Sequence, residues 1–173
     1  MGITAFPVVS GAVVVAGGDS TAKHEAGTIM AYRSVTDQWC LAQYLQLDNN
    51  GISQGEVGVV NFATLKQYSV KKAATADRGA PMVGIALATI ASQKYGFFAI
   101  QGYVEKADLS QTVASGEYLM ISGSTAGKLT SDAASVFNSG TQGNASAFMI
   151  VAVGRTAFAT GVGSVSICGL WGA

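Results

Sequence analysis

Hydrophobic and polar residues alternate in short runs along most of the chain, and this pattern predicts β-strands. The clearest run spans residues 95–104, where aromatic and branched side chains suit a pleated surface. Glycine-rich turns separate the runs at near-regular intervals, which is typical of barrels and sandwiches. We therefore expect an all-β fold, as a compact barrel, β-tulip-like or sandwich domain. Its other strands are expected near residues 28–33, 38–47, 55–70, 82–91, 113–122, 128–130, 147–155 and 163–171.

The run from 38 to 47 has two interpretations. We expect a strand, and the hydrophobic residues that would then share one face at a period of two are Trp39, Leu41, Leu45 and Leu47. A helix is the competing interpretation, because the length permits it. In either case the polar sequence at 48–51 follows as a strong turn.

The first 27 residues differ from the rest and are expected to form an extended arm. Val8-Val9 and Val13-Val14-Val15 are short β-prone runs, and glycines interrupt them. Such runs can add a strand to a neighbouring molecule's sheet, or form an edge strand of the chain's own domain. The expected organisation is therefore an arm over 1–27 and a β-domain over 28–173. Residues 131–146, mostly small and polar, are expected to form an exposed loop of that domain.

Composition changes the picture of the surface. Of the 173 residues, 49% are hydrophobic and only 12% are charged, which is about half the usual charged share. A monomer normally covers its surface with charge, so a surface this poor in ions suits burial against other protein subunits. An ordinary low-charge secreted domain is the alternative.

Charge and targeting signals exclude several classes of protein. Ten basic and ten acidic residues give a net charge of zero, whereas nucleic-acid binding needs clustered Lys and Arg. No stretch has the apolar length needed to cross a bilayer. The N-terminus lacks the basic start of a signal peptide, so we expect synthesis in a cytoplasm. We expect no nucleic-acid and no membrane partner.

Catalytic motifs are incomplete. Gly18-Asp19-Ser20 after a valine run resembles the nucleophile block of the GDSL hydrolases, but the only histidine, His24, lies four residues later instead of near the C-terminus. Residues 122–130 resemble a phosphate loop, yet Ser122 replaces its first glycine and Leu129 replaces the residue that holds magnesium. The glycines at 161 and 163 likewise fail the dinucleotide pattern. We expect a protein that is not an enzyme.

Metal and redox chemistry are also not expected. A single histidine cannot complete a Cys/His zinc site, so Cys40 and Cys168 are expected to be buried free thiols. The sequence at 48–51 lacks the spaced oxygen ligands of a calcium loop. No pair of carboxylates has an arrangement that predicts a matched acid and base. The carboxylates considered were Glu56, Asp77, Glu105, Asp108 and Glu117. We expect no metal and no cofactor.

Three stretches carry a resemblance to a known family. They are "GTIMAYRS…QWCLAQYLQLDNNGISQGEVGVV" from 27 to 60, "GAPMVGIALATIASQKYGFFAIQGYVE…VASGEYLMISGSTAGKLTSDA" from 79 to 133, and "VGRTAFAT…GVGSVSICGL" from 153 to 170. This layout of hairpins and glycines resembles tailed-phage capsid decoration (cement) proteins and related small head proteins. It covers about two-thirds of the chain and has no counterpart in the arm.

The resemblance implies a homotrimer that binds the outside of a phage head and clamps neighbouring major capsid protein subunits. The protein would then reside in the virion, on the outer surface of the capsid. The residues expected at subunit interfaces or in the core beside them are Ile3, Phe6, Val8, Val9, Val13, Val14, Val15, Tyr95, Phe97, Tyr103 and Trp171. A phage tail, fibre or minor head component is the structural alternative. A small carbohydrate-binding or hydrolytic β-domain is the alternative from another class.

Overall fold

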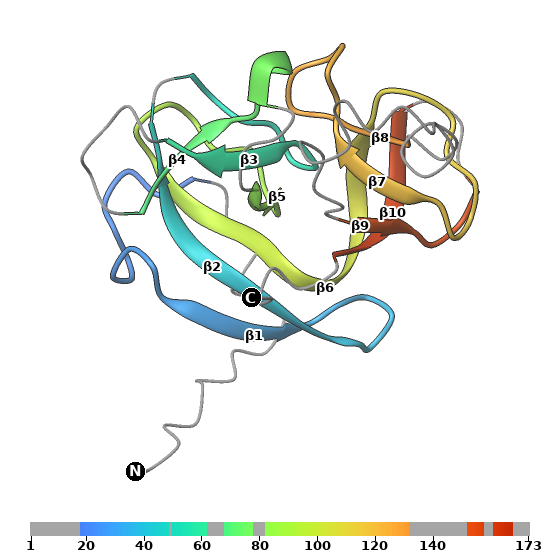
Figure 1. The fold of residues 1–173 in the computed structure, drawn as a ribbon. Coiled ribbons are helices and arrows are strands. Elements are labelled where there is room, and N and C mark those ends of the chain that lie inside the picture. Colours follow the sequence, from blue (N-terminus) through green and yellow to red (C-terminus); the bar gives the residue numbers. More distant parts are fainter. Residues whose placement is uncertain are drawn as a thin grey trace, which may run out of the picture.

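The computed structural model of the chain describes residues 18–48, 50–61, 68–77, 82–131, 152–157 and 161–167. Within these ranges the chain forms β-strands and one short 3₁₀ helix, η1 (Thr75–Asp77), so the predicted all-β fold is confirmed (Figure 1). The strands are β1 (Ile29–Arg33), β2 (Trp39–Leu47), β3 (Val57–Val60), β4 (Ser69–Lys72), β5 (Met82–Ala86), β6 (Tyr95–Leu109), β7 (Tyr118–Ile121), β8 (Leu129–Ser131), β9 (Ala152–Gly154) and β10 (Gly161–Ile167).

The ten strands pair in the order β1-β2-β4-β3-β5-β6-β10-β9-β7-β8. Two further pairings, β2 with β6 and β6 with β8, close this order into two circuits. The first circuit contains β2, β4, β3, β5 and β6, and the second contains β6, β10, β9, β7 and β8. Of the barrel, β-tulip-like and sandwich forms that the sequence suggested, a single clean barrel does not describe these strands, because β6 belongs to both circuits.

Strand β6 is the element that joins the two circuits. In Figure 1 it runs from the strands on the left to those on the right. Its first half pairs with β2 and β5, and its second half pairs with β10 and touches β8 at Leu109. The change of partners falls at Gly102, whose φ is 97°. A Cβ there would lie 2.8 Å from the Sγ of Cys40, so both the backbone and the space require glycine.

The described residues form three hydrophobic clusters. The largest spans both circuits and contains residues from β3, β5, β6, β7, β8, β9 and β10. A second lies within the first circuit around the fully buried Phe98. A third covers the face shared by β1, β2 and β6, and its buried members are Met30, Tyr32, Cys40, Ala42, Tyr44 and Phe97. Alternate residues of β2 thus reach two different clusters, which explains why nearly the whole strand is apolar.

Two details differ from the sequence prediction. Residues 39–47 form a strand, so the helical alternative is wrong, and Trp39 at its start is 54% exposed while Leu45 and Leu47 are buried. The single strand expected over 55–70 is also wrong. It is two strands, β3 and β4, which pair antiparallel with Val60 opposite Val70. The chain must therefore reverse between them, and hydrophobic content alone does not reveal a reversal.

The described part of the predicted arm, residues 18–27, lies against the domain. Asp19 and Tyr95 exchange two backbone hydrogen bonds of 2.8 and 3.0 Å, and the Gly27 N–H donates to the Tyr44 carbonyl at 2.7 Å. The Gly18 N–H donates to the Thr89 carbonyl. Residues 1–17 and 132–146, which carry the rest of the predicted arm and most of the predicted loop, lie outside the described residues. Ser131 is the last residue of β8.

Candidate functional site

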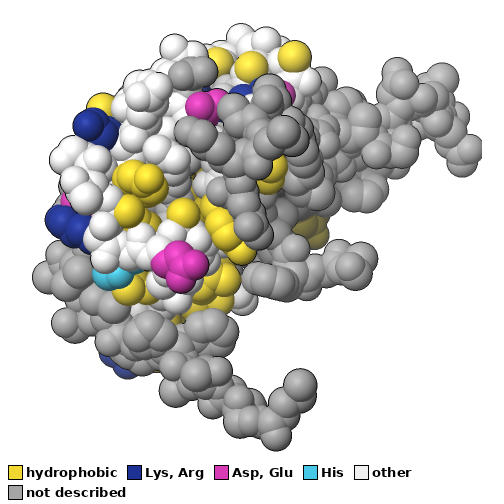
Figure 2. All heavy atoms as spheres, turned by 90° about the vertical axis from the view of Figure 1, so that its left-hand side faces the viewer, with side chains coloured by type: hydrophobic (Ala, Val, Ile, Leu, Met, Phe, Trp, Pro, Cys, Tyr) yellow, Lys and Arg dark blue, Asp and Glu magenta, His cyan; other side chains and the backbone are white. Residues whose placement is uncertain are grey.

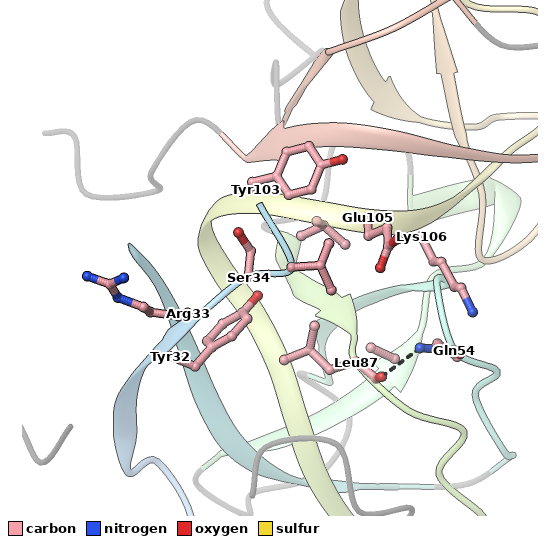
Figure 3. A pocket seen from close by; sticks show the side chains of 11 residues that line it. Tyr32, Arg33, Ser34, Gln54, Leu87, Tyr103, Glu105 and Lys106 are labelled. Atoms are coloured by element: carbon pink, nitrogen blue, oxygen red, sulfur yellow. Dashed lines mark hydrogen bonds between the residues drawn. The ribbon is translucent and has the colours of Figure 1, made fainter. Parts of the chain in front are cut away.

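A pocket of about 240 Å³ opens where β1 ends, β5 ends and the middle of β6 passes (Figure 3). We call it the β1–β6 pocket. Its apolar surface comes from Val35, Ala86, Leu87 and Val104. Its polar and aromatic lining residues are Tyr32, Arg33, Ser34, Gln54, Tyr103, Glu105 and Lys106. Four segments that are distant in the sequence therefore meet at one concave site.

Hydrogen bonds hold the rim of this pocket. The Gln54 side-chain amide donates to the Leu87 carbonyl at 3.1 Å, as the dashed line in Figure 3 shows. The Ser34 hydroxyl accepts from the Gln38 N–H at 3.2 Å and lies 2.9 Å from the Thr36 hydroxyl. The two Ser34 contacts fix the turn between β1 and β2 at the pocket's edge.

Arg33 and Trp39 form a pair beside the pocket. They are direct partners across β1 and β2, and the guanidinium lies 4.9 Å from the centre of the indole ring. Arg33 also forms an ion pair with Asp37, so its charge is already matched within the same hairpin. Both side chains of this ion pair are exposed, and its contribution to stability is therefore small.

Tyr32, which lines the pocket, lies close to Cys40. Tyr32 is only 7% exposed, and its hydroxyl has no hydrogen-bond partner among the described residues. Burial raises the pKa of Tyr32, and the nearby Cys40 thiol raises it further. The Cys40 thiol lies 3.4 Å from the Tyr103 carbonyl and has a pKa raised by burial. Cys40 is a buried free thiol, as predicted, while Cys168 lies outside the described residues.

The residues that resembled a hydrolase block fix residues 18–27 to the domain. The Tyr44 hydroxyl, fully buried, donates to Asp19 Oδ2 at 3.1 Å and accepts from the Lys23 N–H at 3.1 Å. The Lys23 Nζ lies 2.7 Å from Asp19 Oδ1. The His24 ring packs edge-on against Tyr44, with centroids 5.1 Å apart. Ser20 is exposed. These contacts give Asp19 and His24 an anchoring role.

Two of the carboxylates considered from the sequence meet where the two circuits join. Glu56 is buried, accepts from the Ser53 N–H at 2.6 Å and pairs with Lys72 Nζ at 3.1 Å. Burial raises the pKa of the half-buried Asp108; Lys128 opposes this rise, the Glu56 charge adds to it, and Lys72 again opposes it. Two lysines thus accompany the two carboxylates, which indicates a structural cluster at this junction.

The remaining candidate motifs have local structural roles. Asp77 pairs with Lys71 at 3.0 Å, and Glu117 accepts from the Ala114 N–H at 2.8 Å in the turn before β7. Ser122 Oγ accepts from the Thr125 N–H, so the stretch that resembled a phosphate loop is the β7–β8 hairpin. Within the described ranges, no group of three His, Cys, Asp or Glu side chains could hold a metal ion. The same ranges contain no helix that is long and apolar enough to cross a membrane.

Five large hydrophobic side chains are exposed among the described residues. They are Val35, Trp39, Tyr68, Tyr118 and Val162, each at least 45% exposed. Figure 2 shows one face of the molecule, on which hydrophobic side chains lie between uncharged atoms and charged side chains are few. Aromatic side chains are enriched at surfaces that pack against another protein.

The predicted interface residues fall into two groups. Tyr95 stacks on Tyr44 at 5.9 Å, Phe97 is buried beside the same ring, and Tyr103 lines the β1–β6 pocket. The others lie outside the described residues: Ile3, Phe6, Val8, Val9, Val13, Val14, Val15 and Trp171. The sequence analysis did not single out Val35, Gln54 or Leu87, because only the tertiary pairing of β1, β5 and β6 brings them together.

No protein-family model matches the chain, and a search of curated proteins finds no match. The described geometry therefore carries the functional argument, together with the family resemblance noted in the sequence.

Proposed function

We propose that this protein is a capsid decoration protein of a tailed phage, which binds the outer surface of the head as a homotrimer and stabilises contacts between major capsid protein subunits. The resemblance over residues 27–60, 79–133 and 153–170 supports the family. The all-β fold agrees with what that resemblance implies. No catalytic group is required for this role.

The observation that carries the proposal is the apolar, weakly charged surface. Only 12% of the residues are charged, and five large hydrophobic side chains stand exposed on the described part. Burial of such side chains contributes roughly 25 cal/mol per Å² of apolar area, before the entropy of association is subtracted. Copies joined in a trimer add their contacts by multivalency, so no single contact needs to be strong.

A sheet edge provides a second means of attachment. Among the described residues, β1 pairs only with β2, so its other edge can accept an added strand. The valine runs at 8–9 and 13–15 have the composition of such a strand. We assign residues 3–15 to contacts between subunits or with the shell.

Cosedimentation with phage heads tests the proposal. Purified protein is mixed with heads that lack it, and bound copies are counted after sedimentation. Saturation at many copies per head supports a decoration protein, whereas a few copies per particle indicate a tail, fibre or minor head component. No binding to heads contradicts the proposal.

Arm variants test the role of residues 3–15. Deletion of residues 2–16 is expected to abolish head binding and to leave the far-UV circular dichroism of the domain unchanged. Val13→Lys with Val15→Lys should have the same effect, because charge opposes burial of the strand. The matched control places two lysines at the polar positions Thr4 and Ser10 and should retain binding. Full occupancy by the deletion variant would refute the arm's role.

A further inference from the structure

The β1–β6 pocket has the size of a single small ring. Its volume is about 240 Å³. Pockets for drug-sized ligands begin at about 300 Å³. A ligand of one ring therefore fills this pocket better than a dinucleotide or a lipid does.

One wall of the pocket is apolar and held in place by the core. Ala86 and Val104 are buried at 1% and 2% exposure, and Leu87 packs against two of the hydrophobic clusters. The Tyr103 ring lies across the pocket from Leu87 (Figure 3). Apolar and aromatic walls of this kind pack against the C–H faces of a ring.

The rim offers hydrogen bonds in both directions. Gln54 uses one N–H in its bond to Leu87, and its amide has a second N–H. The Glu105 carboxylate belongs to none of the ion pairs among the described residues, and its two oxygens can each accept from a hydroxyl. The Tyr103 hydroxyl can donate or accept. Such a rim suits a ligand whose substituents are themselves donors and acceptors.

The charges around the pocket favour a neutral ligand. Glu105 and Lys106 are adjacent, opposite in sign and both exposed, and Arg33 is paired with Asp37. The Glu105 carboxylate would repel a phosphate, and the pocket has no excess of cations to offset that repulsion. A zwitterion would have to give up its hydration to bind Glu105 and Lys106. Because solvent screens these two exposed charges, they would not compensate for that loss.

We propose that the β1–β6 pocket binds one neutral pyranose, with its C–H face on Leu87 and the Tyr103 ring and its hydroxyls on Glu105, Gln54 and the Tyr103 hydroxyl. This site is separate from the capsid role and does not depend on it. A decoration protein with such a site would display sugar-binding pockets on the particle surface. A ligand of about a dozen non-hydrogen atoms is expected to bind with a dissociation constant in the millimolar range.

Amide NMR titration of the full chain tests this proposal. The probes are the methyl glycosides of glucose, galactose, mannose and N-acetylglucosamine, each added alone. At least one should cause saturable shifts at the amides of Gln54, Leu87 and Glu105. Inorganic phosphate and glycine, added separately, should leave these amides unchanged.

Two variants and one control locate the binding. Glu105 is exposed, so the Glu105→Gln variant should fold normally. The substitution removes charge-assisted hydrogen bonds and should weaken sugar binding about 10-fold. Val35→Trp, at a position that is 74% exposed, adds an indole at the pocket edge and should abolish binding. Glu25→Gln makes the same chemical change on an exposed loop outside the pocket and should bind like the wild type.

Three results would overturn the assignment. The first is no saturable shift with any of the four glycosides up to about 50 mM, well above the expected millimolar dissociation constant. The second is unchanged affinity in both Glu105→Gln and Val35→Trp. The third is tighter binding of phosphate or glycine than of any glycoside at the same amides.

Discussion

Gly102 is the point at which β6 passes from one circuit to the other, and replacing it with alanine tests whether that passage determines the fold. The φ of 97° costs about 1–2 kcal/mol for a residue with a Cβ. The new methyl group would also lie 2.8 Å from Cys40 Sγ and 3.0 Å from Cys40 Cα. Overpacking of this kind costs about 1–3 kcal/mol more. The expected loss of unfolding free energy for Gly102→Ala is therefore about 2–5 kcal/mol, before the lower entropy of the unfolded chain offsets about 0.4–1 kcal/mol.

Gly116→Ala provides a matched control. Its φ is 84°, but a Cβ there would meet nothing within 4 Å. Only the backbone cost applies, and the reduced entropy of the unfolded chain offsets about 0.4–1 kcal/mol of it. The difference between the two variants thus isolates the contact with Cys40, at about 1–3 kcal/mol.

Urea unfolding followed by far-UV circular dichroism measures this difference. With a slope of about 2 kcal/mol per molar urea, a difference of about 2 kcal/mol lowers the midpoint by about 1 M relative to Gly116→Ala. Equal midpoints for the two variants would refute the reasoning. They would mean that β6 does not approach Cys40 closely at Gly102.

Three further predictions concern buried polar groups. Tyr32→Phe removes a buried hydroxyl without a partner among the described residues, so the free energy of unfolding should rise by up to about 1 kcal/mol. A fall of about 1 kcal/mol in the free energy of unfolding would contradict this prediction. With Cys168→Ser, Cys40 should react with Ellman's reagent at least about 100-fold more slowly than after unfolding, because it is buried and its pKa is raised. Asp108→Asn should stabilise the protein near neutral pH, and a pH-independent effect would contradict this.

The sign of the Asp108 effect follows from its raised pKa. Burial favours the protonated carboxyl in the folded state, so its contribution to stability is present below the ordinary value of 3.8 and is lost as pH rises through the folded pKa. Asparagine is neutral at every pH and avoids that loss. The gain from Asp108→Asn should therefore appear as pH rises above about 4 and vanish in acid.

The sequence predicted the strands better than their arrangement. Alternation and turn residues located β1, β2, β5 and the start of β6, because these signals lie within a few neighbouring residues. The parallel pairing of β2 with β4 and the antiparallel pairing of β2 with β6 join residues that are distant in sequence. No local pattern specifies them, and the two circuits therefore could not be predicted.

The candidate site was still less visible in the sequence. Tyr103 was singled out as an aromatic strand residue, and Glu105 as one carboxylate among several. Gln54 and Val35 come from turns, and only the packing of those turns beside β5 and β6 gives them a shared pocket. In the structure, Asp19 and His24 of the hydrolase-like block contact Tyr44 and anchor residues 18–27, and these tertiary contacts could not be predicted from the local motif.

The most direct test of the proposed function is a cryo-EM map of tailed-phage heads to which the purified protein has been added. The account predicts density on the outer surface of the head, at three-fold positions, into which three copies of the two-circuit β-domain fit. Head density without this domain, or its location only in the tail, would contradict the account.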